Sequence, residues 1–368
     1  MRRIAIWGYF GGYGGIERMV YNFYKNIDRD KVQFDFVVPH DFGKIAFEDE
    51  ILNMGGRVFR ILYSERESLI KSRTCWIDYF KEHPEVVGIH VHAQFPYAFP
   101  LSMAKKAKVP LRIFHSHTSN GDYSKNIIDR VIKKIRQREI DTSATLYLAC
   151  SDNAAKFMFP KKEYRWIKNG IEIEKFAFNK KSREEIRGRY GISKDDILLG
   201  TVGHLTDVKN PLYSIEILHE CVKKNPSIKM VMVGEGHLKN ELEKKIKEYG
   251  LERHVFFTGA VKDTSKWYQA FDLLLMPSCY EGFPVVLIEA QVAGLKCLVS
   301  DRITRDADVT GLIDFMSIDM EPTSWAKQID KIMQEKNNVR VEYKEIVEQA
   351  GFGIKQVAKE LEKIYLEI

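Results

Sequence analysis

Short apolar runs alternate with longer stretches of helical periodicity through the first half of the chain, and each run has the length of a buried strand. The first run lies at residues 4–7, and a helical pattern follows at residues 16–27. The further apolar runs lie at residues 34–38, 58–61, 86–91, 111–114 and 146–149. This alternation predicts a parallel sheet covered by helices, which is an α/β fold.

The same pattern returns in the second half. Apolar runs lie at residues 197–202, 228–233, 255–258, 271–276 and 296–300, and helical patterns lie at residues 212–224, 285–293, 325–335 and 343–368. A chain of 368 residues exceeds what one hydrophobic core usually holds, so two domains are expected. A turn signal at Lys168-Asn169-Gly170 and a polar stretch at residues 178–196 mark the boundary. We therefore expect domains at residues 1–177 and 178–345, with a terminal helix at residues 346–368.

Composition narrows the class of protein only modestly. Hydrophobic residues make up 45% and charged residues 29%, as in soluble globular proteins, and no apolar run approaches the length of a membrane span. The five cysteines are scattered along the chain, and no two of them have the close spacing of metal ligands, which favours a reducing cytoplasm. A net charge of +6 is modest for this length, and we expect no nucleic-acid partner.

The most informative stretch is residues 281–289, Glu-Gly-Phe-Pro-Val-Val-Leu-Ile-Glu, which follows an apolar run. Pro284 suits the first position of a helix, and a helix N-terminus after a buried strand offers free amides to a phosphate. The carboxylates of Glu281 and Glu289 would repel a phosphate but accept hydrogen bonds from hydroxyl groups, such as those of sugars and riboses. The alternative is an ordinary turn with a surface glutamate and a helical glutamate.

Two further motifs lie in the first half. Residues 8–15 contain five glycines, which would allow close approach to a phosphate or substrate, or would simply form a flexible loop. His92, His115 and His117 lie at predicted strand ends, where active groups of parallel sheets are found. Together with His90 they have a spacing that could ligate zinc, but no cysteine or carboxylate cluster completes the set, and we expect no metal site.

Glu281 and Glu289, seven residues apart with Gly-Phe-Pro after the first, resemble the signature of the retaining glycosyltransferases of the glycogen-synthase-like family 4. Within that family the chain is most similar to the bacterial capsule and exopolysaccharide branch. The resemblance implies the GT-B fold, in which two Rossmann-like domains face a central cleft and the last helix crosses back to the first domain. It also implies transfer of a sugar from a nucleotide-sugar donor, above all a UDP-sugar, to a glycan or lipid-linked acceptor in capsule, exopolysaccharide or cell-surface glycan synthesis.

The resemblance also assigns roles to single residues. It implies that Lys209 neutralises the donor diphosphate, so that no metal or other cofactor is required, and that the backbone near Val261 contacts the base. The catalytic residues implied are Glu281, His115 and Lys209. The donor-binding residues implied are Gly15, His204, Lys209, Val261, Glu281, Gly282, Phe283, Pro284, Val285 and Glu289. The acceptor-side residues implied are Gly14, His92 and His117.

One position departs from the family pattern. Family members usually carry an arginine five residues before the lysine, and this chain has His204 there. An arginine is charged at every working pH, whereas a histidine is partly neutral near neutral pH. Whether His204 replaces the arginine in function stays open at this point.

Residues 123–140, from Tyr123 to Ile140, predict a basic amphipathic helix with Ile127, Val131 and Ile135 on one stripe. One interpretation is a helix that faces the core with a solvated basic face. The other is an interfacial helix that reaches anionic lipid headgroups, which would suit a lipid-linked acceptor and an enzyme at the inner face of the plasma membrane.

Two other functions are compatible with parts of the sequence. Glycine loops after strands suggest a dinucleotide-dependent oxidoreductase, but neither loop has the Gly-x-Gly-x-x-Gly spacing. A non-catalytic nucleotide-sugar-binding protein would share the donor-site residues and lack transfer activity.

Overall fold

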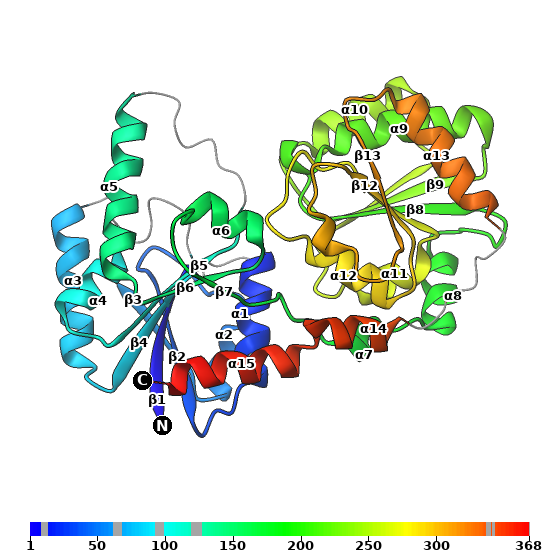
Figure 1. Cartoon of the computed structure of the whole chain (residues 1–368). Helices are drawn as coiled ribbons and strands as arrows, with labels where there is room; N and C mark the ends of the chain where they lie inside the picture. The colour runs from blue at the N-terminus through cyan, green and yellow to red at the C-terminus, as the bar shows by residue number, and fades with distance from the viewer. Residues whose placement is uncertain are drawn as a thin grey trace. The chain divides into compact units, whose positions relative to one another are not determined.

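The computed structural model describes residues 1–8, 14–61, 68–92, 99–118, 127–335, 340 and 343–367. The chain divides into two compact units (Figure 1). The first unit comprises Met1–Ile171 and Gly351–Ile368, and the second comprises Glu172–Ala350. The second unit is therefore an insertion between two segments of the first.

The described strands of the first unit form a seven-stranded sheet in the order β3-β2-β1-β4-β5-β6-β7, and all neighbours are parallel. The strands are β1 (Arg2–Trp7), β2 (Val32–Pro39), β3 (Arg57–Ile61), β4 (Val86–Val91), β5 (Leu111–Ser116), β6 (Leu146–Ala149) and β7 (Arg165–Trp166). The strand order reverses between β1 and β4. In open parallel sheets ligands bind at this switch point, beside the carboxyl ends of the strands.

Helices cover both faces of this sheet. They are α1 (Gly15–Asn26), α2 (Glu48–Asn53), α3 (Leu69–Glu82), α4 (Pro100–Lys106), α5 (Ile127–Ser143), α6 (Asp152–Met158) and α15 (Ile354–Leu366). Phe23 of α1 and Leu361 of α15 belong with Phe34 of β2 to one buried cluster, whereas Trp76 of α3 and Met103 of α4 belong to the cluster on the other face. Figure 1 shows α1 and α15 on one side of the sheet and α3 and α4 on the other.

The C-terminal segment returns to the first unit, as expected, but it is not one continuous helix. Helix α14 (Lys344–Val347) leads into a π-helical turn, Glu348–Phe352, before α15 begins. Gly351 has a φ of 84°, a left-handed conformation that favours glycine and that no α-helix can pass through. Ile171 and Gly353 pair in a short parallel bridge where the chain enters and leaves the first unit.

The described strands of the second unit form a six-stranded parallel sheet in the order β10-β9-β8-β11-β12-β13. The strands are β8 (Ile197–Val202), β9 (Ile228–Val233), β10 (Val255–Gly259), β11 (Leu273–Met276), β12 (Cys297–Ser300) and β13 (Ile313–Met316). The helices, besides α14, are α7 (Ile173–Phe176), α8 (Lys180–Arg189), α9 (Pro211–Lys224), α10 (Lys239–Glu248), α11 (Ser265–Ala270), α12 (Val285–Val292) and α13 (Pro322–Gln334). Both sheets therefore have the Rossmann-like strand order, and the second switch point lies between β8 and β11.

The polar stretch at residues 178–196, expected to carry the boundary, instead holds α8 as part of the second unit. Arg183 and Arg187 of this helix pair with Asp272 at 2.5 and 2.9 Å, which fixes α8 beside β11. Phe176 of α7 is also buried and lies edge-on to Tyr268. The units consequently divide after residues 171 and 350, not after residues 177 and 345.

Candidate functional site

The loop after β8 carries Lys209 to the switch point of the second sheet. Lys209 ends a 3-10 turn, Asp207–Lys209, and Asn210 then adopts a left-handed conformation with a φ of 52° before Pro211 begins α9. The amide of Cys279, in the loop after β11, donates to the Val208 carbonyl at 2.8 Å. The two loops at the switch point are thus joined through their backbones.

Glycines allow the loop after β8 to pack closely against the end of β9. Gly234 has a φ of 140°, and a Cβ atom there would lie 1.9 Å from the Gly203 carbonyl oxygen, so no other residue fits. The amide of Leu205 donates to the Glu235 carbonyl at 2.9 Å. His204 lies exposed on this anchored loop.

Lys209 and Glu281 meet at the switch point. The Lys209 Nζ lies 2.6 Å from Glu281 Oε1, and the two side chains are 26% and 13% exposed. The sequence suggested a role for each residue but gave no sign that they pair. Their partial burial and short distance make them the best-defined charged pair at this edge of the sheet.

Glu281 is followed by the helix that the sequence predicted, with one correction at its start. Pro284 is the N-cap of α12 and Val285 is its first residue, so the proline stands one position earlier than expected. No side chain caps this helix, and in its first turn the Leu287 amide donates to the Pro284 carbonyl at 3.0 Å, which leaves the amides of Val285 and Val286 without an intrahelical acceptor. Gly282 is partly buried and Phe283 is buried, so the turn before the helix is packed against the protein. The helix start therefore offers amides to an anion next to the Lys209–Glu281 pair.

Glu289 lies on α12 and is 7% exposed. Its Oε2 accepts a hydrogen bond from the Tyr268 hydroxyl at 2.5 Å. Burial raises the pKa of Tyr268 well above its usual value, and the charge of Glu289 raises it further, so the hydroxyl remains a donor. Tyr268 could not be identified from the sequence, because no local pattern connects α11 with α12.

Val261 follows β10 and lines a cavity of about 410 Å³ within the second unit. Tyr190 and Trp267, which meet edge-on with ring centroids 5.3 Å apart, line the same cavity. Val261, which the resemblance assigns to contact with the nucleotide base, thus lines a cavity that is also lined by two aromatic side chains.

At the switch point of the first sheet, Gly14 is the N-cap of α1 and Gly15 is its first residue. A Cβ atom on Gly14 would lie 2.4 Å from the Glu17 carboxylate, whereas one on Gly15 would meet open space. Residues 9–13 of the predicted glycine loop lie outside the described part of the chain.

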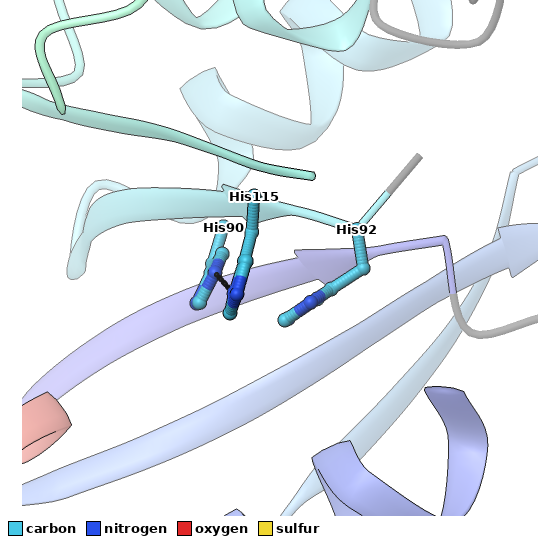
Figure 2. A group of neighbouring side chains, drawn as sticks. All are labelled: His90, His92 and His115. Atoms are coloured by element: carbon cyan, nitrogen blue, oxygen red, sulfur yellow. Dashed lines mark hydrogen bonds between the residues drawn. The ribbon is translucent and has the colours of Figure 1, made fainter. Parts of the chain in front are cut away.

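Four histidines, which we call the histidine cluster, gather at the carboxyl ends of β4 and β5: His90, His92, His115 and His117. His92 follows β4 directly, but His115 lies inside β5 and not after it as expected. His92 Nδ1 lies 2.9 Å from His117 Nε2, and His90 Nε2 lies 3.1 Å from His115 Nδ1. Figure 2 shows the rings of His90 and His115 side by side, joined by this contact, with the His92 ring next to them.

Burial keeps the histidine cluster neutral. It lowers the pKa of His90, His92 and His115 well below the usual 6.5, with a further decrease from neighbouring histidines. It lowers the pKa of His117 to about 3. At neutral pH each imidazole therefore has one N–H donor and one acceptor nitrogen.

The basic helix is observed as α5, but its apolar stripe does not face the core. Val131, Ile132 and Ile135 are 50%, 43% and 60% exposed. The core-facing interpretation is therefore wrong for this part of the helix. Residues 119–126 and the side chain of Ile127 lie outside what the structure describes.

All five cysteines are free. Within the described residues, every helix is too short or too polar to cross a bilayer.

Two family models match the chain, one on each unit. Residues 13–175 match the model described as Glycosyltransferase Family 4, and residues 182–350 match the model described as Glycosyl transferases group 1. Among solved structures, Anabaena Alr3699/HepE in complex with UDP and glucose has a TM-score of 0.82 at 17% identity, with both chains covered completely. This likeness confirms the GT-B fold.

Three curated relatives bear names of glycosyltransferases. EpsF of Bacillus subtilis (strain 168) is 31% identical over 358 residues, which cover 96% of this chain and 93% of the relative. The UDP-Gal:alpha-D-GlcNAc-diphosphoundecaprenol alpha-1,3-galactosyltransferase of Escherichia coli is 30% identical, over 64% of this chain and 63% of the relative. The capsular polysaccharide biosynthesis glycosyltransferase CapH of Staphylococcus aureus is 27% identical, over 96% and 95%.

The GT-B fold, together with the two family models, defines a GT-B glycosyltransferase. The chain belongs to family 4 of the glycosyltransferases, and its similarity to relatives in capsule and exopolysaccharide synthesis confirms the branch predicted from the sequence.

Proposed function

We propose that the protein is a retaining glycosyltransferase that moves a sugar from a UDP-sugar to a hydroxyl group of a glycan or lipid-linked saccharide during synthesis of a surface polysaccharide. The observation that carries this proposal is the Lys209–Glu281 pair beside the start of α12. It combines a cation and helix amides for a diphosphate with a carboxylate for a sugar hydroxyl. The names of the E. coli and S. aureus relatives support the lipid-linked and capsular acceptors.

In the transfer, the bond between the anomeric carbon and the diphosphate oxygen breaks, and its electron pair leaves with UDP. The acceptor hydroxyl oxygen forms the new bond and releases its proton. Lys209 and the first amides of α12 offset the charge that develops on the leaving diphosphate, which is why we propose that no metal ion is required. Glu281 orients the transferred sugar and Glu289 binds the ribose.

The test is a screen of nucleotide sugars for thermal stabilisation, since ligand binding raises the apparent stability of the native state. The stabilising donor is then supplied with lipid-linked acceptors, with and without EDTA, and the anomeric configuration of the product is read by NMR. We expect a UDP-sugar to bind, transfer to persist in EDTA, and the anomeric configuration to be kept. Donor binding without transfer or hydrolysis would favour the non-catalytic alternative, and bound nicotinamide absorbance would favour the oxidoreductase.

We also propose that α5 contacts anionic lipid at the inner face of the plasma membrane. Val131 and Ile135 form an exposed apolar row, and a row of exposed basic side chains lies beside it: Arg130, Lys134 and Arg138. Apolar groups flanked by basic groups are what an interfacial helix presents to anionic headgroups.

Cosedimentation with vesicles rich in anionic lipid at low salt tests this contact. The double variant Val131→Ser/Ile135→Ser should lose most of the binding. The matched control is Leu52→Ser, which removes another exposed apolar side chain of the same unit. Equal retention of wild type and double variant would contradict the proposal.

A further inference from the structure

A chain of buried hydrogen bonds connects the C-terminal helix α15 to the histidine cluster at the carboxyl ends of β4 and β5. The Tyr365 hydroxyl on α15 lies 2.6 Å from His90 Nδ1, and His90 Nε2 lies 3.1 Å from His115 Nδ1. Tyr365 is 1% exposed and both histidines are 0% exposed. The three side chains come from α15, β4 and β5, so the connection exists only in the folded unit.

The direction of the protons in this chain follows from counting donors and acceptors. Burial raises the pKa of Tyr365, so its hydroxyl keeps its proton, and His90 is neutral. If Tyr365 donates to His90 Nδ1, then His90 Nε2–H donates to His115 Nδ1, and the single proton of His115 resides on Nε2. In the opposite direction the Tyr365 proton would be buried without an acceptor among the described residues, and such an orphaned donor is costly.

The nitrogen at the end of this hydrogen-bond chain, His115 Nε2, indicates that a ligand binds there. His115 Nε2 is buried and has no hydrogen-bond partner in the described part of the protein. Buried polar atoms in native proteins are nearly always paired, so an orphaned one calls for an explanation. A protonated Nε2 is a donor, and its natural partner is an oxygen that accepts a hydrogen bond.

We propose that Tyr365 and His90 are positioning residues that hold His115 in the tautomer with its proton on Nε2, so that His115 donates a hydrogen bond to a hydroxyl oxygen of the sugar substrate. This inference rests on the proposed function for the identity of the substrate. It assigns to the C-terminal helix a role in the active site of the first unit.

A metal ion is the competing explanation. Nitrogens of His90, His92 and His115 all lie within 4.8 Å of one another, close enough for one ion. However, both nitrogens of His90 and the Nδ1 of His115 already serve in the hydrogen-bond chain. An ion between His90 and His115 would have to displace their mutual hydrogen bond, so tautomer control accounts better for the observed contacts.

The test is long-range proton–nitrogen NMR on the full-length protein labelled with 15N-histidine, which separates protonated from bare ring nitrogens. The His115 signals are assigned by their absence in His115→Gln. We expect protonated Nε2 and bare Nδ1 in the wild type, and a mixture of tautomers in Tyr365→Phe. The matched control is Tyr79→Phe, which removes another buried tyrosine hydroxyl of the same unit, bonded to Asp35 at 3.0 Å, and should leave the histidine signals unchanged.

Kinetics supply the second readout. Because Tyr365→Phe leaves two tautomers of similar stability, only about half of the molecules would have the competent one, so kcat/KM for the donor should fall by about twofold, and it should be unchanged in Tyr79→Phe. A wild-type His115 with its proton on Nδ1, an unaltered tautomer in Tyr365→Phe, or one tightly bound metal ion per chain that is lost in His90→Gln would each overturn the inference. Failure to find any transfer activity would overturn the proposed function instead, because the tautomer is measured without substrate.

Discussion

Replacing Glu281 by glutamine should tighten the binding of UDP while it removes most of the sugar transfer. The Lys209 ammonium lies 2.6 Å from the Glu281 carboxylate. A diphosphate must compete with this carboxylate for the same cation and is also repelled by it. Glutamine removes both effects, but it is a poorer acceptor for a sugar hydroxyl than a carboxylate.

The exposure of the pair sets the expected size of the change. Fully exposed ion pairs contribute about 0–1 kcal/mol, and these side chains are 26% and 13% exposed, so the pair lies at the upper end of that range. Release of about 1 kcal/mol corresponds to about a fivefold decrease in the Kd for UDP. Loss of a charge-assisted hydrogen bond to the transferred sugar should lower kcat by about 10- to 100-fold.

Isothermal titration with UDP and steady-state kinetics with the donor varied measure the two effects. Lys209→Met should weaken UDP binding by about tenfold or more, since it removes the cation itself. The matched control is Glu216→Gln, which breaks the similarly exposed pair with Lys245 between α9 and α10 and should leave UDP binding unchanged. Weaker UDP binding by Glu281→Gln would refute the reasoning, because it would mean that the carboxylate positions Lys209 for the diphosphate rather than competing with it.

Three further predictions concern other parts of the structure. Glu289→Gln should raise the donor Kd by about tenfold with little change in kcat, because ribose contacts change little between ground and transition states. Tyr268→Phe should raise the donor Kd by a smaller factor. Equal kcat losses in Glu281→Gln and Glu289→Gln would contradict this prediction. His204→Ala should weaken UDP binding, and His204→Arg should bind UDP at least as tightly as the wild type, because the planar arginine fork pairs well with a diphosphate; equal affinity of all three proteins would exclude His204 as a diphosphate contact. The histidine cluster should destabilise the first unit in acid. Burial lowers the pKa of each imidazole, so below about pH 6.5 the unfolded chain binds protons that the native state does not. The free energy of unfolding should fall by up to about 1.4 kcal/mol per pH unit for each imidazole until the native form is protonated, near a pKa of about 3 for His117. Urea unfolding at several pH values should show a shallower decrease in His117→Gln, and an unchanged slope would contradict the assignment.

The strands that could be predicted from the sequence are those that are apolar and buried on both faces. The runs at residues 86–91, 146–149, 197–202 and 228–233 coincide with β4, β6, β8 and β9. Strand β7 has only two residues, and Asp314 interrupts the apolar residues of β13, so neither forms a continuous apolar run, and β13 could not be predicted from the sequence. The polar sequence of α8 is typical of a domain boundary, because the pairing of Arg183 and Arg187 with Asp272, which holds the helix in place, is remote in sequence.

The candidate site divides in the same way. The turn before α12 could be predicted because Gly282 and Pro284 indicate a turn in the local sequence. The pairing of Lys209 with Glu281, the hydrogen bond from Tyr268 to Glu289 and the link from Tyr365 to His90 were not predictable, since each joins elements that only the folded sheet order brings together. The sequence indicates which residues carry chemistry, whereas the partners that tune them are set by tertiary contacts.

The insertion of the second unit within the first has a consequence for biosynthesis. Ile354, Val357 and Leu361 of α15 complete the core beneath β1 and β2, yet they are synthesised only after the whole second unit. The first unit can therefore finish folding only after residues 172–350 have been synthesised, because its sheet stays partly uncovered until α15 follows them. During that interval its apolar face is open to aggregation, and termination after residue 350 but before α15 would leave a complete second unit attached to an incomplete first one.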